Sequence, residues 1–244
     1  MERFTDGRHA EAAIEEWLFT AWTGDGSLGL VSGHRIVGRT AWYWAALARR
    51  DRPLLHVLDD GIRVRRDPFV VKGEALWAEH TRDAPMEQWS IGNETYAAAL
   101  EEPDDALGRA YGDPTPIAFD LEWYALGPPD PLADDTGASG YRQPGVVHGV
   151  IEVAGEPRIE LREVPASRWH RWTSAASMPP VDLPVASAHH GVRAPFTFPD
   201  GTVADLVLTP DGWCRRAGRA RPVSSRGGRL PARGTRSVTR RSGA

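Results

Sequence analysis

Alternation of apolar and polar residues with a period of two dominates this chain. In TPIAFDLEWY (115–124), one face carries Ile117, Phe119, Leu121 and Trp123, and the other face carries two carboxylates. Successive side chains of a strand point to opposite faces of a sheet, so the pattern predicts a half-buried β-strand. A chain built mainly from such strands has to protect its sheet edges, either by closing the sheet or by stacking a second sheet on it.

Similar runs recur along the chain between turn sequences rich in Gly, Asp and Pro. We predict one short helix in 103–112, because Pro103 can begin it and Gly112 can end it. So little helix cannot cover a large sheet. The sequence therefore predicts an all-β fold of antiparallel meanders that form a barrel or two half-barrels. The other predicted strands are 14–22, 28–37, 40–48, 53–58, 69–80, 87–98, 145–153, 158–163 and 202–208.

The chain is expected to divide into three parts: a β unit in 1–112, a second β unit in 113–214 and a disordered tail in 215–244. The tail contains ten Arg and no acidic residue, with few apolar residues. Removing those ten Arg leaves 19 basic against 33 acidic residues in 1–214, a net charge of −14. Such an acidic body argues against nucleic acid as a ligand. We expect deletion of the tail to leave thermal stability unchanged.

Composition also bears on location and cofactors. The single cysteine, Cys214, excludes an internal disulfide and fits a reducing compartment. No apolar run reaches about 18 residues, so no membrane span is expected, and the N-terminal residues lack a signal-peptide pattern. We expect a cytoplasmic protein. No phosphate-binding glycine motif and no hydrolase elbow occurs, so we expect no cofactor.

A family resemblance rests on the pattern Trp-x-x-His-x-x-Asp-x-Pro-x-Glu-x-Trp-Ser-x-Gly at 77–92, followed by FDLEW, GVVHGV and RWHRW elements. The chain resembles an uncharacterised bacterial family related to the carotenoid hydratases (hydroxyneurosporene synthase) and to lipocalin-like proteins. The resemblance runs from about Phe4 to Trp213, and Thr173 stands where Gly is more usual. It implies two lipocalin-like β units and a hydrophobic terpenoid, steroid or acyl ligand.

The first candidate site is the pair of strands that meets near Pro85. A histidine and a carboxylate across a hairpin, His80 with Asp83 or Glu87, form a reasonable acid–base pair. The alternative is that these charges only stabilise the strand ends. Aromatic ligand-binding residues expected beside them are Trp77 and Trp89.

The second candidate is FDLEW, where Asp120 and Glu122 share a face roughly 6–7 Å apart. Two desolvated carboxylates at this spacing would raise the pKa of one of them and create a proton donor. Protonating an alkene is the difficult step in adding water to an isoprenoid double bond. The alternative is a solvated strand face behind the apolar face that carries Trp123.

Two later strands offer further candidates. His148 lies among valines in GVVHGVIEV and is expected either to contact a ligand or to be a satisfied core histidine. In RWHRW, a strand would place Arg168, His170 and Trp172 on one face. Arg168 and His170 could bind a carboxylate or polarise a carbonyl. Arg stacked on Trp for structural reasons is the alternative.

We predict no metal site, because no histidine falls in a recognised short metal-ligand spacing. A three-His site assembled from different strands stays open as an alternative. The histidines considered are His80, His148, His170, His189 and His190.

Two functions follow. One is a cofactor-independent hydratase, isomerase or cyclase that acts on a hydrophobic small molecule in an aromatic-lined cavity, with a carboxylic acid or His as proton donor. The other is a lipocalin-like binding or carrier protein for an apolar small molecule. Convergence of two ionisable groups inside a closed cavity would favour the enzyme. If all four acids, Asp83, Glu87, Asp120 and Glu122, point to solvent, the enzyme hypothesis fails. Oligomeric state stays open.

Overall fold

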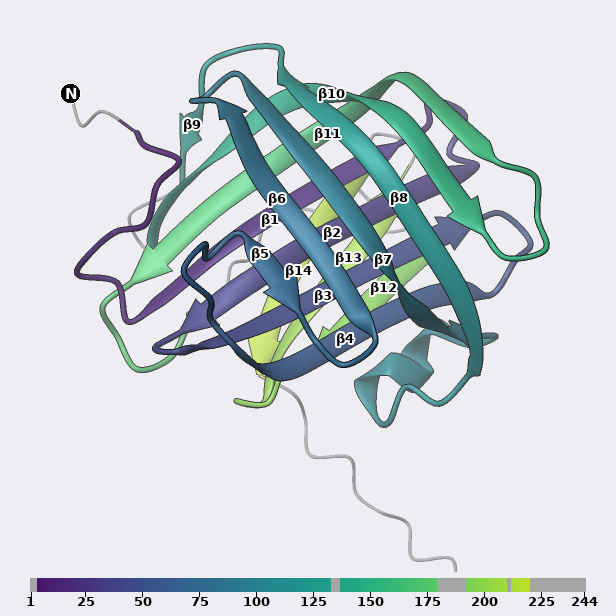
Figure 1. Cartoon of the computed structure of the whole chain (residues 1–244), viewed down its shortest axis with the longest axis horizontal. Coiled ribbons are helices and arrows are strands. Elements are labelled where there is room, and N and C mark those ends of the chain that lie inside the picture. Colours follow the sequence, from purple (N-terminus) through teal and green to yellow (C-terminus); the bar gives the residue numbers. More distant parts are fainter. Residues whose placement is uncertain (1–3, 133–136, 180–191, 210–211, 220–244) are drawn as a thin grey trace, which may run out of the picture.

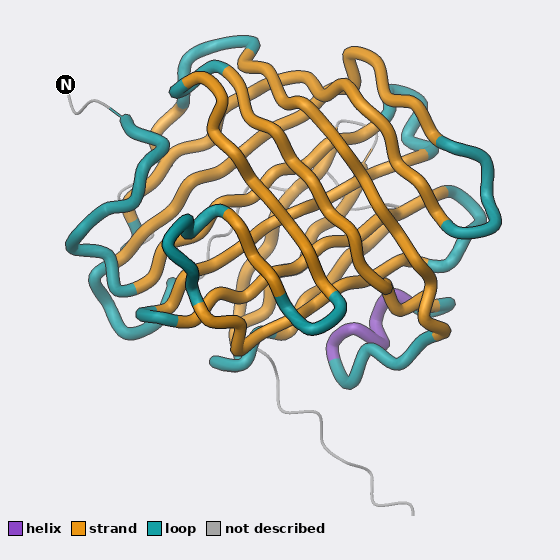
Figure 2. Tube along the Cα trace, viewed as in Figure 1, coloured by secondary structure: helices purple, strands orange, loops and turns teal. Residues whose placement is uncertain are grey.

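A closed ring of eight antiparallel strands encloses the main core, and a three-stranded sheet packs against its outside (Figures 1 and 2). This computed structural model describes residues 4–132, 137–179, 192–209 and 212–219. Around the ring, the strands follow the order β4-β3-β2-β1-β11-β10-β8-β7, and the pairing of β4 with β7 closes it. The ring strands are β1 (Ile14–Trp22), β2 (Leu28–Val37), β3 (Thr40–Arg49), β4 (Leu54–Arg63), β7 (Gln88–Leu100), β8 (Asp113–Ala125), β10 (Ser139–Val153) and β11 (Ile159–Thr173).

Three short or peripheral strands and one helical turn complete the barrel. Beyond β7, β6 (Leu76–Ala84) and β5 (Val70–Lys72) extend the wall, and β9 (Asp130–Pro131) pairs with β10. The helical turn, η1 (Pro103–Leu107), lies between β7 and β8.

Side-chain alternation explains the barrel interior. In β8 the apolar residues from Ile117 to Trp123 are buried inside, whereas Asp120 and Glu122 are exposed outside. In β7, Trp89, Ile91 and Asn93 are buried in the same way. The interior-facing residues of all ring strands therefore form one continuous core.

The second sheet consists of β12 (Val192–Thr197), β13 (Thr202–Thr209) and β14 (Gly212–Arg219). It covers the outer face of β1 to β3, where Trp42 and Trp44 pack with Phe196, Phe198 and Trp213. Because both faces of these ring strands are covered, β3 is buried at eight successive positions.

The all-β antiparallel fold with one short helical turn is confirmed. Two features of the fold bear on the expected division of the chain. The ranges 1–112 and 113–214 share one ring, since β1 pairs with β11 and β7 with β8, and the boundary near 112 separates neighbouring strands of one sheet. Residues 215–219, at the start of the expected tail, belong to β14, and Arg215 is buried against the barrel, so a deletion from residue 215 would remove a buried side chain. Residues 220–244 lie outside the described part of the chain.

No described helix is long and apolar enough to cross a bilayer.

Candidate functional site

A chain of hydrogen-bonded polar side chains runs through the apolar interior of the barrel. His34 on β2 and His80 on β6 face each other with their Nδ1 atoms 2.6 Å apart. His80 Nε2 lies 2.8 Å from Ser32 Oγ, which lies 3.0 Å from the hydroxyl of Tyr43. Asn93 on β7 donates to that hydroxyl at 2.8 Å. We call these five residues the histidine network; all are buried.

Burial controls the protonation of the histidine network. It lowers the pKa of His80 to about 3 and lowers the pKa of His34 well below its usual range, with the neighbouring His80 adding to the effect on His34. Burial also raises the pKa of the Tyr43 hydroxyl, although hydrogen bonds from Ser32 and Asn93 oppose this. At neutral pH the network is therefore uncharged, and it can exchange protons without a buried ion at rest.

The ring of Trp17 separates the histidine network from a second polar group. It stacks on His34 at 4.8 Å between centroids and on His170 at 4.7 Å. His170 Nε2 lies 2.9 Å from Glu15 Oε1, and His9 Nδ1 lies 2.8 Å from the same oxygen. Burial lowers the pKa of His170, and its hydrogen bond to Glu15 opposes that shift.

Arg168 on β11 forms a third polar group, which we call the Arg168 clamp. Its Nε and Nη2 donate to Gln143 Oε1 at 2.9 and 2.6 Å, and its Nη1 lies 2.6 Å from Asp6 Oδ1. The guanidinium lies 5.0–5.5 Å from the ring centroids of Trp89, Trp123 and Tyr141. A fully buried cation is thus held by aromatic faces and by one carboxylate.

The N-terminal segment (residues 4–12) closes this end of the barrel, at the left of Figure 1. Its Asp6 carboxylate accepts hydrogen bonds from the Tyr141 hydroxyl at 2.7 Å and from the backbone of Met86, and its Thr5 carbonyl faces His170 Nδ1 at 3.0 Å. Deeper in the barrel, a small cavity lies beside Ser32 and Phe19. Its volume of about 10 Å³ has room for about one water molecule. With the segment in place, this cavity between Phe19 and Ser32 is too small for a ligand larger than water.

Half of the residues predicted as a site converge in this interior. His80, Arg168 and His170 all face inward. The aromatic residues Trp89 and Trp123 line the Arg168 clamp, and Trp172 stacks on His9 with 3.7 Å between ring centroids. The face predicted for RWHRW is the one that β11 turns inward.

The other half lies outside the barrel. All four predicted acids are exposed, and Ser90 donates to Asp83 on the surface at 2.8 Å. His148 is partly exposed and forms a T-shaped ring contact with Tyr124, with 5.7 Å between the ring centroids. All four acids are on the outer face, so the enzyme hypothesis fails in the form that uses these carboxylates as proton donors. The exposed acids are Asp83, Glu87, Asp120 and Glu122.

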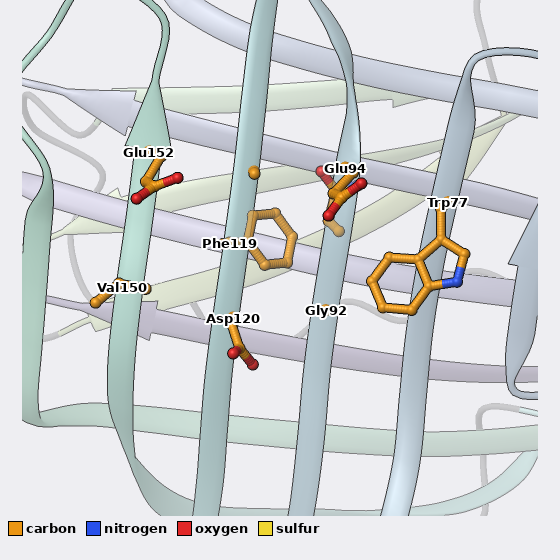
Figure 3. A pocket seen from close by; sticks show the side chains of 9 residues that line it. Trp77, Gly92, Glu94, Phe119, Asp120, Val150 and Glu152 are labelled. Carbon is orange, nitrogen blue, oxygen red and sulfur yellow. The ribbon is translucent and has the colours of Figure 1, made fainter.

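Two of the outward residues share a shallow groove on the outer face of β6, β7, β8 and β10. Trp77, Glu94, Asp120 and Glu152 project from the near side of the sheet in Figure 3, whereas Phe119 lies behind it. Three carboxylates face solvent here, beside the apolar surface of Trp77, Ala118 and Val150.

Several interior residues were not predicted from sequence. Ser32, His34 and Tyr43 occupy inward positions of strands that read as apolar runs, so polar residues at alternate positions of VSGHRIV were a usable signal. Asp6 and His9 carried no such signal, because the N-terminal segment has no periodic pattern.

Comparisons with known proteins identify no family for this chain. No protein-family description and no curated protein matches the chain. Matching solved structures are those of CghA with Sch210972 and of CghA, each 14% identical, with TM-scores of 0.40 and 0.36. Each match covers 81% of this chain and 53% of the other, so the chain spans about half the length of CghA. The resemblance to the carotenoid hydratase group stays a prediction.

Proposed function

We propose that the barrel interior binds an apolar small molecule that carries an acidic or carbonyl group, and that the Arg168 clamp contacts its polar end. The observation that carries this proposal is the origin of the counter-ion of Arg168. Gln143 and three aromatic rings of the barrel wall surround the guanidinium, but its carboxylate partner, Asp6, comes from the N-terminal segment. A ligand carboxylate can therefore take the place of Asp6.

This exchange is favourable for electrostatic reasons. A buried guanidinium without a counter-ion costs several kcal/mol, so Arg168 has to stay paired when the N-terminal segment moves. A ligand anion preserves the pairing while its apolar part contacts Phe19, Trp89 and Trp123. Because the cavity beside Phe19 and Ser32 has room for about one water, we infer that ligand binding displaces the segment.

The test uses an anionic naphthalene-sulfonate dye, whose fluorescence rises on transfer to an apolar site. The D6N variant removes the carboxylate that pairs with Arg168, so the segment competes less with the dye. We expect dye affinity to rise about tenfold, which is the contribution of one charge-assisted hydrogen bond. Adding Arg168→Met in this background removes the cation without leaving Asp6 as an unpaired buried charge. The double variant should therefore lose at least the gained tenfold.

Arg142→Met in the D6N background is the matched control. Arg142 is exposed on the outer face of the barrel, over the ring of Trp169 at 5.3 Å. It should leave dye affinity unchanged. Equal affinities of D6N and D6N/R168M would disprove a role for Arg168 in binding.

Catalysis on the bound molecule is a second candidate function, and the 2.6 Å contact between His34 and His80 favours it. A neutral imidazole of this pair can accept a proton from the bound molecule, and the Tyr43 hydroxyl, linked to His80 through Ser32, can return one. A cofactor-independent isomerase, hydratase or cyclase working in this way needs none of the exposed acids.

Incubation in D₂O with apolar extracts of the source cells tests this second function. Mass spectrometry should detect a metabolite that gains deuterium with the protein and not with H80Q. The D83N/E87Q and D120N/E122Q variants should retain the exchange, because these acids are on the outer surface. If they abolish it and H80Q does not, the histidine network is not the proton carrier.

A further inference from the structure

We propose that His9, Glu15 and His170 bind a divalent transition-metal ion of the zinc class. The three residues come from the N-terminal segment, β1 and β11, and their ligand atoms all lie within 4.8 Å of one another. Two imidazoles and one carboxylate form a common ligand set for such ions, with a further position left for water.

The hydrogen bonds of His170 carry the argument. Its Nδ1 faces the Thr5 carbonyl at 3.0 Å and its Nε2 faces Glu15 Oε1 at 2.9 Å. Both partners are acceptors, whereas a neutral imidazole has only one N–H. If Nδ1–H donates to Thr5, the Nε2 lone pair points at the carboxylate, and a metal ion bound by both atoms, which need to separate slightly from 2.9 Å, satisfies both.

The surroundings match those of a metal-binding histidine. Ligating imidazoles usually donate the second ring N–H to a backbone carbonyl or a carboxylate, which fixes the ring orientation. The Thr5 carbonyl supplies that acceptor for His170. His9 is oriented by stacking on Trp172 with an interplanar angle of 11°. Both rings are thus held with Nε2 of His170 and Nδ1 of His9 facing one oxygen of Glu15.

The site is open on one side. The His9 side chain is 15% exposed, whereas Glu15 and His170 are almost fully buried. Arg8 Nε lies 3.5 Å from Glu15 Oε2 and is the cation that competes for this carboxylate. An ion at this position would tie the N-terminal segment to the barrel wall.

Calorimetric titration of the full chain with Zn²⁺ tests the proposal, and the visible absorption of Co²⁺ reports the ligand field. We expect one ion per chain. Loss of a direct ligand in His9→Ala or His170→Ala should weaken binding by more than about 100-fold, since loss of an outer partner alone costs about 10–100-fold. H9A removes a partly exposed side chain of the N-terminal segment, so it should remain folded if H170A does not.

Two control variants separate this site from other histidines. Arg8→Gln removes the competing charge and should strengthen binding. H189A/H190A, which alters the adjacent pair outside the described residues, should bind Zn²⁺ as the unmodified chain does. Absence of stoichiometric binding, or binding that survives H9A and is lost in H189A/H190A, would overturn the proposal.

Discussion

Replacing Glu16 by Gln should lower the free energy of unfolding by about 3–5 kcal/mol, the usual cost of breaking a fully buried ion pair on one side. Glu16 lies between the barrel and the second sheet. Its Oε2 accepts from Arg35 Nε and Nη2 at 2.9 and 2.7 Å, and its Oε1 lies 2.5 Å from Arg215 Nη1. Arg171 is directly opposite on β11. The variant would leave three buried guanidinium groups without this carboxylate.

The pKa of Glu16 shows how strongly these charges act. Burial alone would raise it, but Arg215, Arg35 and Arg171 together hold the pKa of this carboxyl well below its usual range. Asp200, which lies 3.7 Å from Arg35 and is partly exposed, is a weak substitute for Glu16. The buried cluster therefore depends on one carboxylate.

Urea denaturation measures the change in the free energy of unfolding. An unchanged slope of this free energy against urea concentration would show that the same unfolding transition is compared. Glu160→Gln is the matched control, because Glu160 pairs with Arg162 on the surface and should change stability by less than about 0.5 kcal/mol. E16Q/R215M should recover part of the loss, because it removes a cation together with the anion. A cost below about 1 kcal/mol for E16Q would mean that the three Arg have other counter-charges.

Local periodicity was sufficient to predict most of the ring. The bounds of β1 and β2 agree with the predicted 14–22 and 28–37. The second sheet was harder to predict for physical reasons. Pro195 in β12 argues against a strand, and the Arg-rich sequence of β14 resembles a solvated tail. Arg215 tolerates burial only because Glu16, far away in sequence, compensates its charge.

The site was predicted where strand alternation determines the direction of a side chain. Position parity in a strand separates His80 from Trp77 and Trp89 from Ser90 onto opposite faces, but parity does not say which face is enclosed. Contacts between distant segments were beyond reach. Asp6 meets Arg168 and Glu15 meets His170 across more than 150 residues of chain, and no local pattern encodes such pairings.

Acidification should destabilise the protein well above the pH at which its carboxylates titrate. Burial lowers the pKa of His80 from 6.5 to about 3 and that of His56 to about 4. Between those values and pH 6.5, the unfolded chain binds protons that the folded protein does not. The free energy of unfolding therefore decreases as the pH falls through this window, by about 1.4 kcal/mol per pH unit for each such histidine. His34 contributes in the same direction.

For His80 alone, lowering the pH from 7 to 5 should cost about 2 kcal/mol, so H80Q should show a decrease smaller by about that amount. Urea denaturation at the two pH values measures this difference. The Glu16 cluster does not interfere: its carboxyl has a lowered pKa, so the stability it contributes is lost only below about pH 4.5. An H80Q variant with the full decrease would show that His80 is not held neutral in the barrel, and would remove the basis for proton exchange through the histidine network.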